Sequence, residues 1–177
     1  MLRTLPTADL TAAERAVVRQ MLDLAFAGNF GDADWDHCLG GLHVVAVERD
    51  EVVAHAAVVQ RSFLHAERAW RCGYVEAVAV HPRWRGQGFA AAVMAEAERI
   101  VDHGYDLGAL AASASGRGLY LRRGWLPWQG HTFTLSPTGP RRTAEDDDGT
   151  FVRVVPGGAD LHLTGTLTCD WRDGDVW

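Results

Sequence analysis

The chain has 177 residues, of which 47% are hydrophobic and 23% are charged, and its formal net charge is −6. This length suits one folded domain spanning residues 1–177, and the composition excludes a disordered, collagen-like or coiled-coil chain. The acidic balance argues against binding to a phosphate backbone, so we expect no nucleic-acid partner.

The first half of the chain predicts a helix followed by three strands. Thr11-Ala-Ala-Glu14 is a capping box, and apolar residues continue at helical spacing as far as Ala25. Two glycines then end this helix, and Asp32–Asp36 is able to start a further helical turn. Strand-like segments separated by short polar turns follow over residues 42–49, 52–65 and 69–81, an order typical of an antiparallel meander.

The second half alternates between helices and strands. Pro82 ends the third strand, and an amphipathic helix begins near Phe89. A short apolar strand over 107–112, a polar break and a short helix near 119–123 come next, and residues 126–169 are expected to form further strands. This order predicts an α/β protein with a single mixed, largely antiparallel sheet flanked by helices.

Several features favour a reducing cytoplasm. The longest apolar run, Phe89–Ala95, is far shorter than the ~18 residues of a membrane-spanning helix, and the N-terminus shows no apolar signal segment. Cys38, Cys72 and Cys169 are too few and too widely spaced for a disulfide framework or a zinc site, and the histidines lack ligand spacing. We therefore expect a cytoplasmic protein with no metal and no membrane partner.

The strongest chemical signal is the segment Val78–Ala90, which combines a strand end, a turn rich in arginine and glycine, and a helix start. Glycines let a ligand approach the backbone closely, and the N–H groups at a helix N-terminus favour an anion. The guanidinium of Arg85 is able to form paired hydrogen bonds with phosphate oxygens. The segment matches neither a Walker A loop nor the GxGxxG motif. It predicts a phosphate-binding turn, with an ordinary β–α turn as the alternative.

Arg85-x-x-Gly88-x-Ala90 after a strand resembles the acyl-CoA pyrophosphate loop of the GCN5-related N-acetyltransferases (GNATs). Within that superfamily the chain resembles the aminoglycoside 2′-N-acetyltransferases over almost its whole length. The similarity is carried by residues 27–35, 71–80, 123–128, 137–140 and 169–177. The resemblance implies the GNAT fold and direct acetyl transfer from acetyl-CoA to the 2′-amino group of an aminoglycoside in a ternary complex. It also suggests a homodimer.

The resemblance implies which residues contact the acyl-CoA. The backbone N–H of Val78 polarises the thioester carbonyl, and Ser115–Tyr120 lines the cofactor channel. By the same resemblance, Tyr120 lies near the sulfur of the acyl-CoA and protonates the leaving thiolate. The sequence by itself favours another interpretation, a tyrosine that only packs against its neighbours. The residues expected to contact acetyl-CoA are Val78, Ala79, Val80, Arg85, Gly86, Gln87, Gly88, Phe89, Ala90, Ser115 and Tyr120.

Glu76 is singled out by the strand that contains it. Alternation places Glu76 on one face with Tyr74 and Val78, and a carboxylate in so apolar a strand is costly unless it is paired or solvated. A buried ion pair with an arginine is one interpretation, and a functional carboxylate in a cleft is the other. Acetyl transfer needs a neutral amine, so Glu76 is the candidate general base, acting through water.

Acidic residues are concentrated at the end of the chain. Residues 144–177 contain far more acidic residues than arginines and carry the whole net charge. Such a segment attracts a cationic ligand, with a solvated loop as the alternative. Trp171 and Trp177 give this tail a reason to fold back and be buried. The resemblance implies that the aminoglycoside is contacted by Asn29, Asp34, Glu76, Ala77, Ala111, Asp146, Asp147, Asp175 and Trp177, the last through its carboxylate.

Two positions depart from the family pattern. Asn29 and Ala111 stand where the mycobacterial-type enzymes have an aspartate and a serine that contact the aminoglycoside, which leaves the substrate range open. Asp34 is alternatively a first-turn acid of a helix. Two other functions also stay open: a GNAT that acts on another small polyamine or a peptide amine, and a non-catalytic acyl-CoA-binding module. The presence of both Glu76 and Tyr120 argues against the latter.

Overall fold

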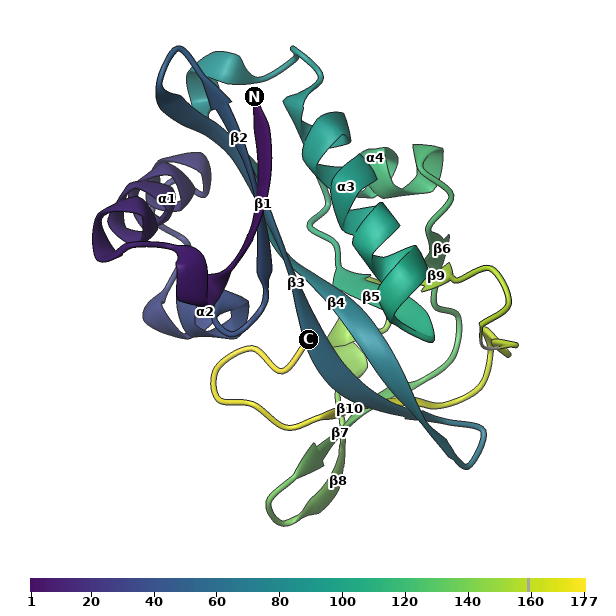
Figure 1. Cartoon of the computed structure of the whole chain (residues 1–177). Helices are drawn as coiled ribbons and strands as arrows, with labels where there is room; N and C mark the ends of the chain where they lie inside the picture. The colour runs from purple at the N-terminus through teal and green to yellow at the C-terminus, as the bar shows by residue number, and fades with distance from the viewer. Residues whose placement is uncertain (159) are drawn as a thin grey trace. The chain divides into compact units, whose positions relative to one another are not determined.

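The computed structural model (Figure 1) describes residues 1–158 and 160–177. The chain forms two compact units. Unit 1 comprises Met1–Val59 and Val75–Ile100, and unit 2 comprises Gln60–Tyr74 and Val101–Trp177. Three long elements contribute residues to both units: the strands β3 (Glu51–His65) and β4 (Arg68–Val80), and the helix α3 (Phe89–Gly104). That residues 1–177 form a single domain stays a prediction.

Unit 1 places two helices beside a short antiparallel ladder. Strand β2 pairs with β1 on one side and with β3 on the other. Helix α1 begins at the predicted capping box, in which the N–H of Thr11 donates to Glu14 Oε2 at 2.9 Å. Its buried side chains Val18 and Leu22 belong to the same core cluster as Val45 of β2. The elements of unit 1, besides its parts of β3, β4 and α3, are β1 (Leu2–Pro6), η1 (Thr7–Asp9), α1 (Ala12–Ala25), α2 (Asp32–Cys38), β2 (Leu42–Glu48) and η2 (Pro82–Trp84).

Strand β1 is the element that the sequence does not predict. It pairs only with β2, in a register that sets Thr4 opposite Val44, and its residues alternate between exposed and half-buried. An edge strand of this kind buries little apolar surface, and Pro6 at its end is a residue tolerated at sheet edges. The usual hydrophobic signal of a strand is therefore weak in this segment.

The strands of unit 2 belong to the same ten-stranded sheet as β1 and β2, in which the order of the other strands is β6-β9-β5-β4-β3-β10-β7-β8. Two pairs are parallel, β4 with β5 and β10 with β7, whereas β5–β9, β6–β9, β7–β8 and β3–β10 are antiparallel. Besides its parts of β3, β4 and α3, the elements of unit 2 are β5 (Leu107–Ala111), α4 (Arg117–Arg122), β6 (Leu126–Pro127), β7 (Thr132–Ser136), β8 (Gly139–Arg142), η3 (Ala144–Asp146), β9 (Thr150–Val154) and β10 (Leu167–Asp170).

Glycine allows the close packing of α3 in unit 2. A Cβ at Gly73 would lie 2.6 Å from the ring of Tyr105, and one at Gly108 would lie 2.9 Å from Val101. Both distances are too short for real atoms, so the last turn of α3 and the segment after it contact β4 and β5 where these strands carry no side chain. The sheet thereby keeps a helix against one face.

The tail of the chain folds back in part. Val176 and Trp177 are 4% and 2% exposed, and the indole N–H of Trp177 donates to Thr143 Oγ1 at 2.9 Å, which confirms the prediction for Trp177. The prediction that Trp171 is buried is wrong. Its side chain stays 37% exposed because it stacks against the guanidinium of Arg141, 5.1 Å from the ring centroid, instead of entering the core.

Both units combine helices with strands, and the strand pairings are mostly antiparallel, so the predicted α/β class with a mixed sheet is confirmed. Cys38, Cys72 and Cys169 are buried, and none of them forms a disulfide in the described part of the chain. In the part of the chain that the structure describes, no helix combines the length and the apolar character needed to cross a membrane.

Candidate active site

The predicted phosphate-binding turn lies in unit 1, between the end of β4 and the start of α3. After η2, Gly86 and Gly88 have φ angles of +75° and +87°, which L-residues rarely adopt. A Cβ built on either glycine would meet none of the described atoms within 4 Å. The backbone of the turn therefore has open space beside it, as the close approach of a ligand requires.

The start of α3 supplies hydrogen-bond donors to this space. Its first helical hydrogen bond runs from the N–H of Ala92 to the carbonyl of Gly88, at 3.0 Å. The amides before Ala92 have no partner within the helix, and the dipole of a 16-residue helix places partial positive charge there. Arg85–Gly88 are exposed, and Phe89 and Ala90 are half-buried. The turn and the helix start together form a surface suited to an anion.

Arg85 holds the turn against the end of α1. Its Nη2 donates to the carbonyl of Ala25 at 2.7 Å, and its Nε donates to the carbonyl of Val80 at 3.4 Å. A cation is favourable at the C-terminus of a helix. Gln87 donates more weakly, to the carbonyl of Arg83 at 3.5 Å. In this structure the guanidinium of Arg85 thus contacts backbone carbonyls, a role that the sequence does not indicate.

Strand β4 contains a residue in the left-handed region, Ala77, with φ of +47°. For an alanine this conformation costs about 1–2 kcal/mol, and within a strand it produces a local irregularity of the bulge type. The regular alternation expected along this strand is therefore wrong at Ala77. Glu76 and Val78, which flank it, are both half-buried, and the carbonyl of Ala77 accepts a hydrogen bond from His55 Nδ1 at 3.0 Å.

Two further predicted substrate residues belong to unit 1. Asn29 is exposed in the connection between α1 and α2. Asp34 is half-buried in the first turn of α2, where its Oδ2 accepts the N–H of Gly31 at 2.7 Å. Asp34 therefore caps its own helix, as the alternative interpretation has it, and this bond fixes the direction of its carboxylate.

Tyr120 lies in α4 of unit 2 and is 7% exposed. Its ring contacts those of Trp125 and Phe151, with centroid distances of 6.4 Å and 6.1 Å. Burial raises the pKa of its hydroxyl to about 12, so this group keeps its proton at neutral pH. Tyr120 is thus both a packing residue and a group able to donate a proton. Ser115, in the turn before α4, and Ala111, at the end of β5, are exposed.

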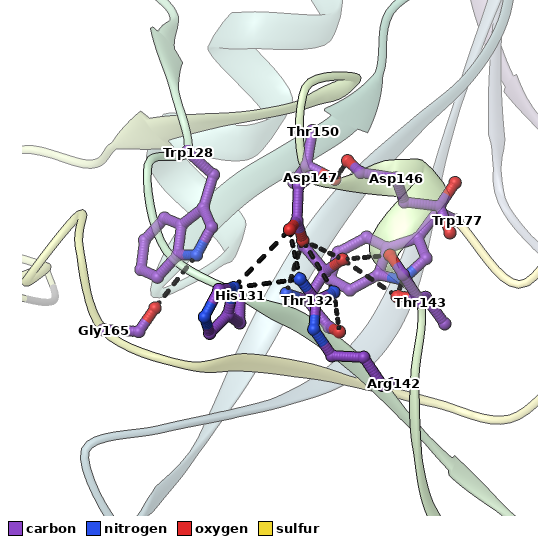
Figure 2. A network of polar contacts seen from close by, with 10 residues as sticks. All are labelled: Trp128, His131, Thr132, Arg142, Thr143, Asp146, Asp147, Thr150, Gly165 and Trp177. Atoms are coloured by element: carbon purple, nitrogen blue, oxygen red, sulfur yellow. Dashed lines mark hydrogen bonds and ion pairs between the residues drawn. The ribbon is translucent and has the colours of Figure 1, made fainter.

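Asp147 is the centre of a polar network in unit 2 (Figure 2). Its carboxylate accepts hydrogen bonds from the backbone N–H of Thr132 at 2.9 Å and from two nitrogens of Arg142. These bonds hold the pKa of Asp147 far below its usual range, with the Arg142 hydrogen bonds the largest cause. Thr132 and Thr143 bond to each other, and Thr143 Oγ1 accepts the indole N–H of Trp177. Asp147 thereby links β7 to β8, and Thr143 connects this network to the tail.

Asp146, which directly precedes Asp147 in the chain, has a different environment. Burial, followed by the charges of Asp175 and Glu145, raises the pKa of Asp146 to about 6. Asp175 Oδ1 accepts the backbone N–H of Trp177 at 3.1 Å, and Arg172 donates to the backbone oxygens of both residues at 2.9 Å. A cation bound beside the carboxylate of Asp146 would offset the burial and the neighbouring negative charges that raise its pKa.

Two residues that organise the site in unit 1 are not indicated by the spacing of metal ligands in the sequence. His43 and His55 are fully buried in unit 1, in the two strands β2 and β3 that pair with each other. The signal that could have pointed to them is a polar residue in each of two neighbouring apolar strands. Among the residues described, no group of three potential ligands is arranged to hold a metal ion.

Comparison with known proteins adds an independent finding. A family model for the acetyltransferase (GNAT) domain matches residues 8–127. A curated aminoglycoside 2′-N-acetyltransferase of Mycolicibacterium fortuitum is 54% identical to the chain over 177 residues, which cover 99% of this chain and 91% of the relative.

Solved structures share the fold at low sequence identity. The CoA complex of YhbS, a GNAT family N-acetyltransferase from Escherichia coli, is 17% identical with a TM-score of 0.66, over 95% of this chain and 88% of that one. An acyl-CoA N-acyltransferase from Pseudomonas aeruginosa is 17% identical with a TM-score of 0.62, over 87% and 99% of the two chains. These likenesses establish a similar fold.

Proposed function

The chain belongs to the GNAT acetyltransferases and, within them, to the family of the aminoglycoside 2′-N-acetyltransferases, and on this premise we propose that it transfers an acetyl group from acetyl-CoA to the 2′-amino group of an aminoglycoside. The observation that carries the proposal is the open turn with two left-handed glycines at the start of α3. Transfer is proposed to occur by direct attack of the amine in a ternary complex.

The turn fits the pyrophosphate of an acyl-CoA. Gly86 and Gly88 leave the backbone uncovered, and the first amides of α3 are directed at an anion by helix geometry. The cosubstrate supplies the activated acetyl group. Within the bulge of β4, the N–H of Val78 is proposed to donate to the thioester carbonyl oxygen, where negative charge develops. The other residues that the resemblance places against acetyl-CoA are proposed to contact it as well: Ala79, Val80, Arg85, Gln87, Phe89, Ala90 and Ser115.

Two side chains are proposed to move protons. Glu76 removes the ammonium proton of the acceptor through a water molecule, and its half-buried position beside the bulge suits a base that is shielded from bulk solvent. Tyr120 donates its proton to the departing sulfur. Its hydroxyl is protonated at neutral pH, as that of an ordinary tyrosine is, so a proton is available for transfer; burial, which raises its pKa to about 12, makes the hydroxyl a weaker acid and does not itself support the role.

Carboxylates are proposed to hold the polycationic acceptor. Asp146 and Asp175 in unit 2, with the end of Trp177, and Asp34 in unit 1 supply negative charge. The carboxylate of Asp147 already contacts Arg142 and Thr132, so we assign it mainly to positioning Asp146. Asn29 and Ala111 give weaker, neutral contacts. A cation beside Asp146 would also counteract the burial and, after it, the neighbouring negative charges that raise the pKa of this residue.

Regiochemistry tests the proposal. Gentamicin and tobramycin carry a 2′-amine, whereas kanamycin A and amikacin carry a hydroxyl there. Acetylated product, measured by mass spectrometry, is expected with the first pair only. Comparable acetylation of both pairs would overturn the 2′ assignment, and acetylation of spermidine or a peptide amine alone would indicate another acceptor. Binding of coenzyme A without acetylation of any amine would indicate a non-catalytic module.

Assembly and location are proposals of the same kind. We propose a homodimer that acts in the cytoplasm and confers resistance to 2′-amino aminoglycosides. Sedimentation equilibrium would give the mass in solution, and expression in a sensitive bacterial host would show whether resistance follows the 2′-amine pattern. One cooperative unfolding transition would support the assignment of residues 1–177 to a single domain.

A further inference from the structure

A chain of buried polar side chains ends at the bulge of β4. His55 Nδ1 lies 3.0 Å from the carbonyl oxygen of Ala77, and His55 Nε2 lies 3.0 Å from His43 Nδ1. His43 Nε2 in turn lies 2.8 Å from Thr7 Oγ1, which also accepts the N–H of Gly40 at 2.9 Å. Both imidazoles are 0% exposed, and all of these residues belong to unit 1.

The carbonyl of Ala77 determines the direction of every hydrogen bond in this chain. A carbonyl only accepts, so the proton of His55 must be on Nδ1. Burial lowers the pKa of His55 to about 3 and that of His43 to about 4, so both rings are neutral at pH 7. His55 Nε2 therefore accepts from His43 Nδ1, and His43 Nε2 accepts from the hydroxyl of Thr7. This contact, at 2.8 Å, is shorter than the other contact of that hydroxyl, to the carbonyl of Gly41 at 3.3 Å. Both histidines have the Nδ1–H tautomer.

We propose that Thr7, His43 and His55 form a positioning chain that orients and polarises the peptide group between Ala77 and Val78. The carbonyl of Ala77 and the N–H of Val78 belong to one planar peptide unit and point in opposite directions. A donor fixed on the carbonyl therefore fixes the direction of the N–H. Donation to the carbonyl also strengthens the N–H as a donor, because linked hydrogen bonds polarise one another.

The inference rests on the proposed function in one respect, namely that the N–H of Val78 donates to the thioester carbonyl. The conformation of Ala77 gives a physical reason for the hydrogen-bonded chain of Thr7, His43 and His55. Its φ of +47° is unfavourable for an alanine and needs support from its surroundings. Two buried imidazoles are also costly core residues compared with aliphatic side chains, unless their hydrogen bonds have a role. Here each ring nitrogen has a partner, and the chain ends at the strained residue.

Substitutions of His55 test the kinetic consequence. His55→Leu removes the donor, so kcat with tobramycin is expected to fall by roughly 10- to 100-fold, the scale of a displaced catalytic group. The KM values for acetyl-CoA and tobramycin should change little, because this bond matters most where charge develops. His55→Asn places an amide N–H near the position of Nδ1 and is expected to restore much of the lost kcat.

The protein contains a matched control on the same strand. His65 is also buried on β3 and also places Nδ1 against a backbone carbonyl, that of Thr166, at 2.9 Å. His65→Leu should therefore lower the melting temperature as His55→Leu does, yet leave kcat near the wild-type value. Wild-type kcat in His55→Leu, or an equal loss of kcat in both leucine variants, would overturn the inference.

Nuclear magnetic resonance tests the orientation without any substrate. Long-range ¹H–¹⁵N spectra should show His43 and His55 as neutral Nδ1–H tautomers, with a scalar coupling between His43 Nδ1 and His55 Nε2 across the hydrogen bond. The amide resonance of Val78 should move in His55→Leu and, to a lesser extent, in Thr7→Val, but not in His65→Leu. An Nε2–H tautomer of His55, or an unchanged Val78 resonance in His55→Leu, would contradict the inference. If the wild-type protein acetylated no amine, the proposed function would fail while these spectra still decided the orientation.

Discussion

The two units support their proposed chemistry by different means. Apart from the carboxylates of Glu76 and Asp34, the candidate features of unit 1 belong to the backbone: the left-handed Ala77, the open glycines at 86 and 88, and the first amides of α3. The imidazoles behind them are neutral. Apart from Tyr120, the candidate features of unit 2 are charged side chains, with Asp147 paired to Arg142 and Asp146 beside Asp175. The proposed contacts to the cosubstrate rely mainly on fixed dipoles, and those to the acceptor rely mainly on ionised groups.

This difference predicts how each unit responds to conditions. Peptide dipoles and neutral imidazoles keep their strength over the working range of pH and salt. Exposed or half-exposed carboxylates are screened by salt within about 8–10 Å and lose charge as they are protonated. We therefore expect cosubstrate binding to be robust and acceptor binding to depend on pH and ionic strength.

The largest expected effect concerns the base in unit 1. Glu76→Gln should lower kcat by roughly 10²–10⁴-fold, as is typical when a positioned base is removed. The deficit should shrink at high pH, where the free amine is present without help. Steady-state kinetics across the pH range would measure both effects. Glu48→Gln, in the same unit at the end of β2, serves as a control with near-normal kcat. Full activity of Glu76→Gln at neutral pH would exclude Glu76 as the base.

The next effect concerns the backbone of the turn. Gly88→Val adds a branched side chain to a residue with φ of +87°, which costs about 1–2 kcal/mol and obstructs the approach of a ligand. Isothermal titration should show coenzyme A binding at least about tenfold more weakly. Gly124→Val is the matched control, because Gly124 has φ of +82° and equally open space but lies outside the turn. Equal affinity in both variants would mean that the pyrophosphate is bound elsewhere.

A moderate effect is expected from the acidic pair in unit 2. Asp146→Asn and Asp175→Asn should each raise the KM for tobramycin by about tenfold, since a hydrogen bond to a charged group contributes roughly 1.5–3 kcal/mol. The KM for acetyl-CoA should stay unchanged. In the wild-type protein the tobramycin KM should rise as pH falls through about 6, where Asp146 becomes protonated. Added salt should lower kcat/KM for tobramycin. A value that does not change with salt would contradict binding of the acceptor by ionised carboxylates.

The smallest effects concern stability and have opposite signs at adjacent residues. The pKa of Asp147 is lowered, so its stabilisation is present above pH 4 and is lost as pH falls further; Asp147→Asn should destabilise the protein at pH 7 by about 1–3 kcal/mol. The pKa of Asp146 is raised, so ionisation of this residue destabilises the fold as pH rises through about 6. Asp146→Asn should therefore stabilise the protein at pH 8 and have little effect at pH 4.

Denaturant titrations of both variants at pH 4 and pH 8 would measure this contrast. The gain from Asp146→Asn is on the order of 1 kcal/mol at most, because the half-exposed carboxylate is partly screened by solvent. Loss of stability in Asp146→Asn at pH 8 would show that its carboxylate has a stabilising partner. It would also contradict the opposite effects that ionisation of Asp146 and ionisation of Asp147 are expected to have on stability.

Local signals in the sequence predict much of the fold and of unit 1. The capping box at Thr11, the helix after Gly88 and the three strands of the meander follow from residue spacing and are present within a few residues. The turn at Arg85–Gly88 was found in the same way. Each of these features depends on interactions between residues that are close in the sequence.

The remaining features depend on partners far apart in the chain. Strand β10 pairs with β7 from more than thirty residues away, and neither segment contains a sign of its partner. The left-handed conformation of Ala77 leaves no mark on an alternating apolar strand, because no glycine is present. The charge excess of residues 144–177 is partly balanced by arginines outside that segment, which the sequence does not indicate, since Asp147 and Asp170 contact Arg142 and Arg61 of the same unit.

The burial of the three cysteines has a practical consequence for the assay. Acetyl transfer releases coenzyme A, whose thiol is counted by disulfide reagents. Cys38, Cys72 and Cys169 are each 0% exposed, and burial raises the pKa of Cys72 and Cys169, so the folded enzyme contributes little to such a signal. An unfolded chain exposes all three. The reagent that follows turnover would therefore also report, in the absence of substrate, how many molecules have lost their fold.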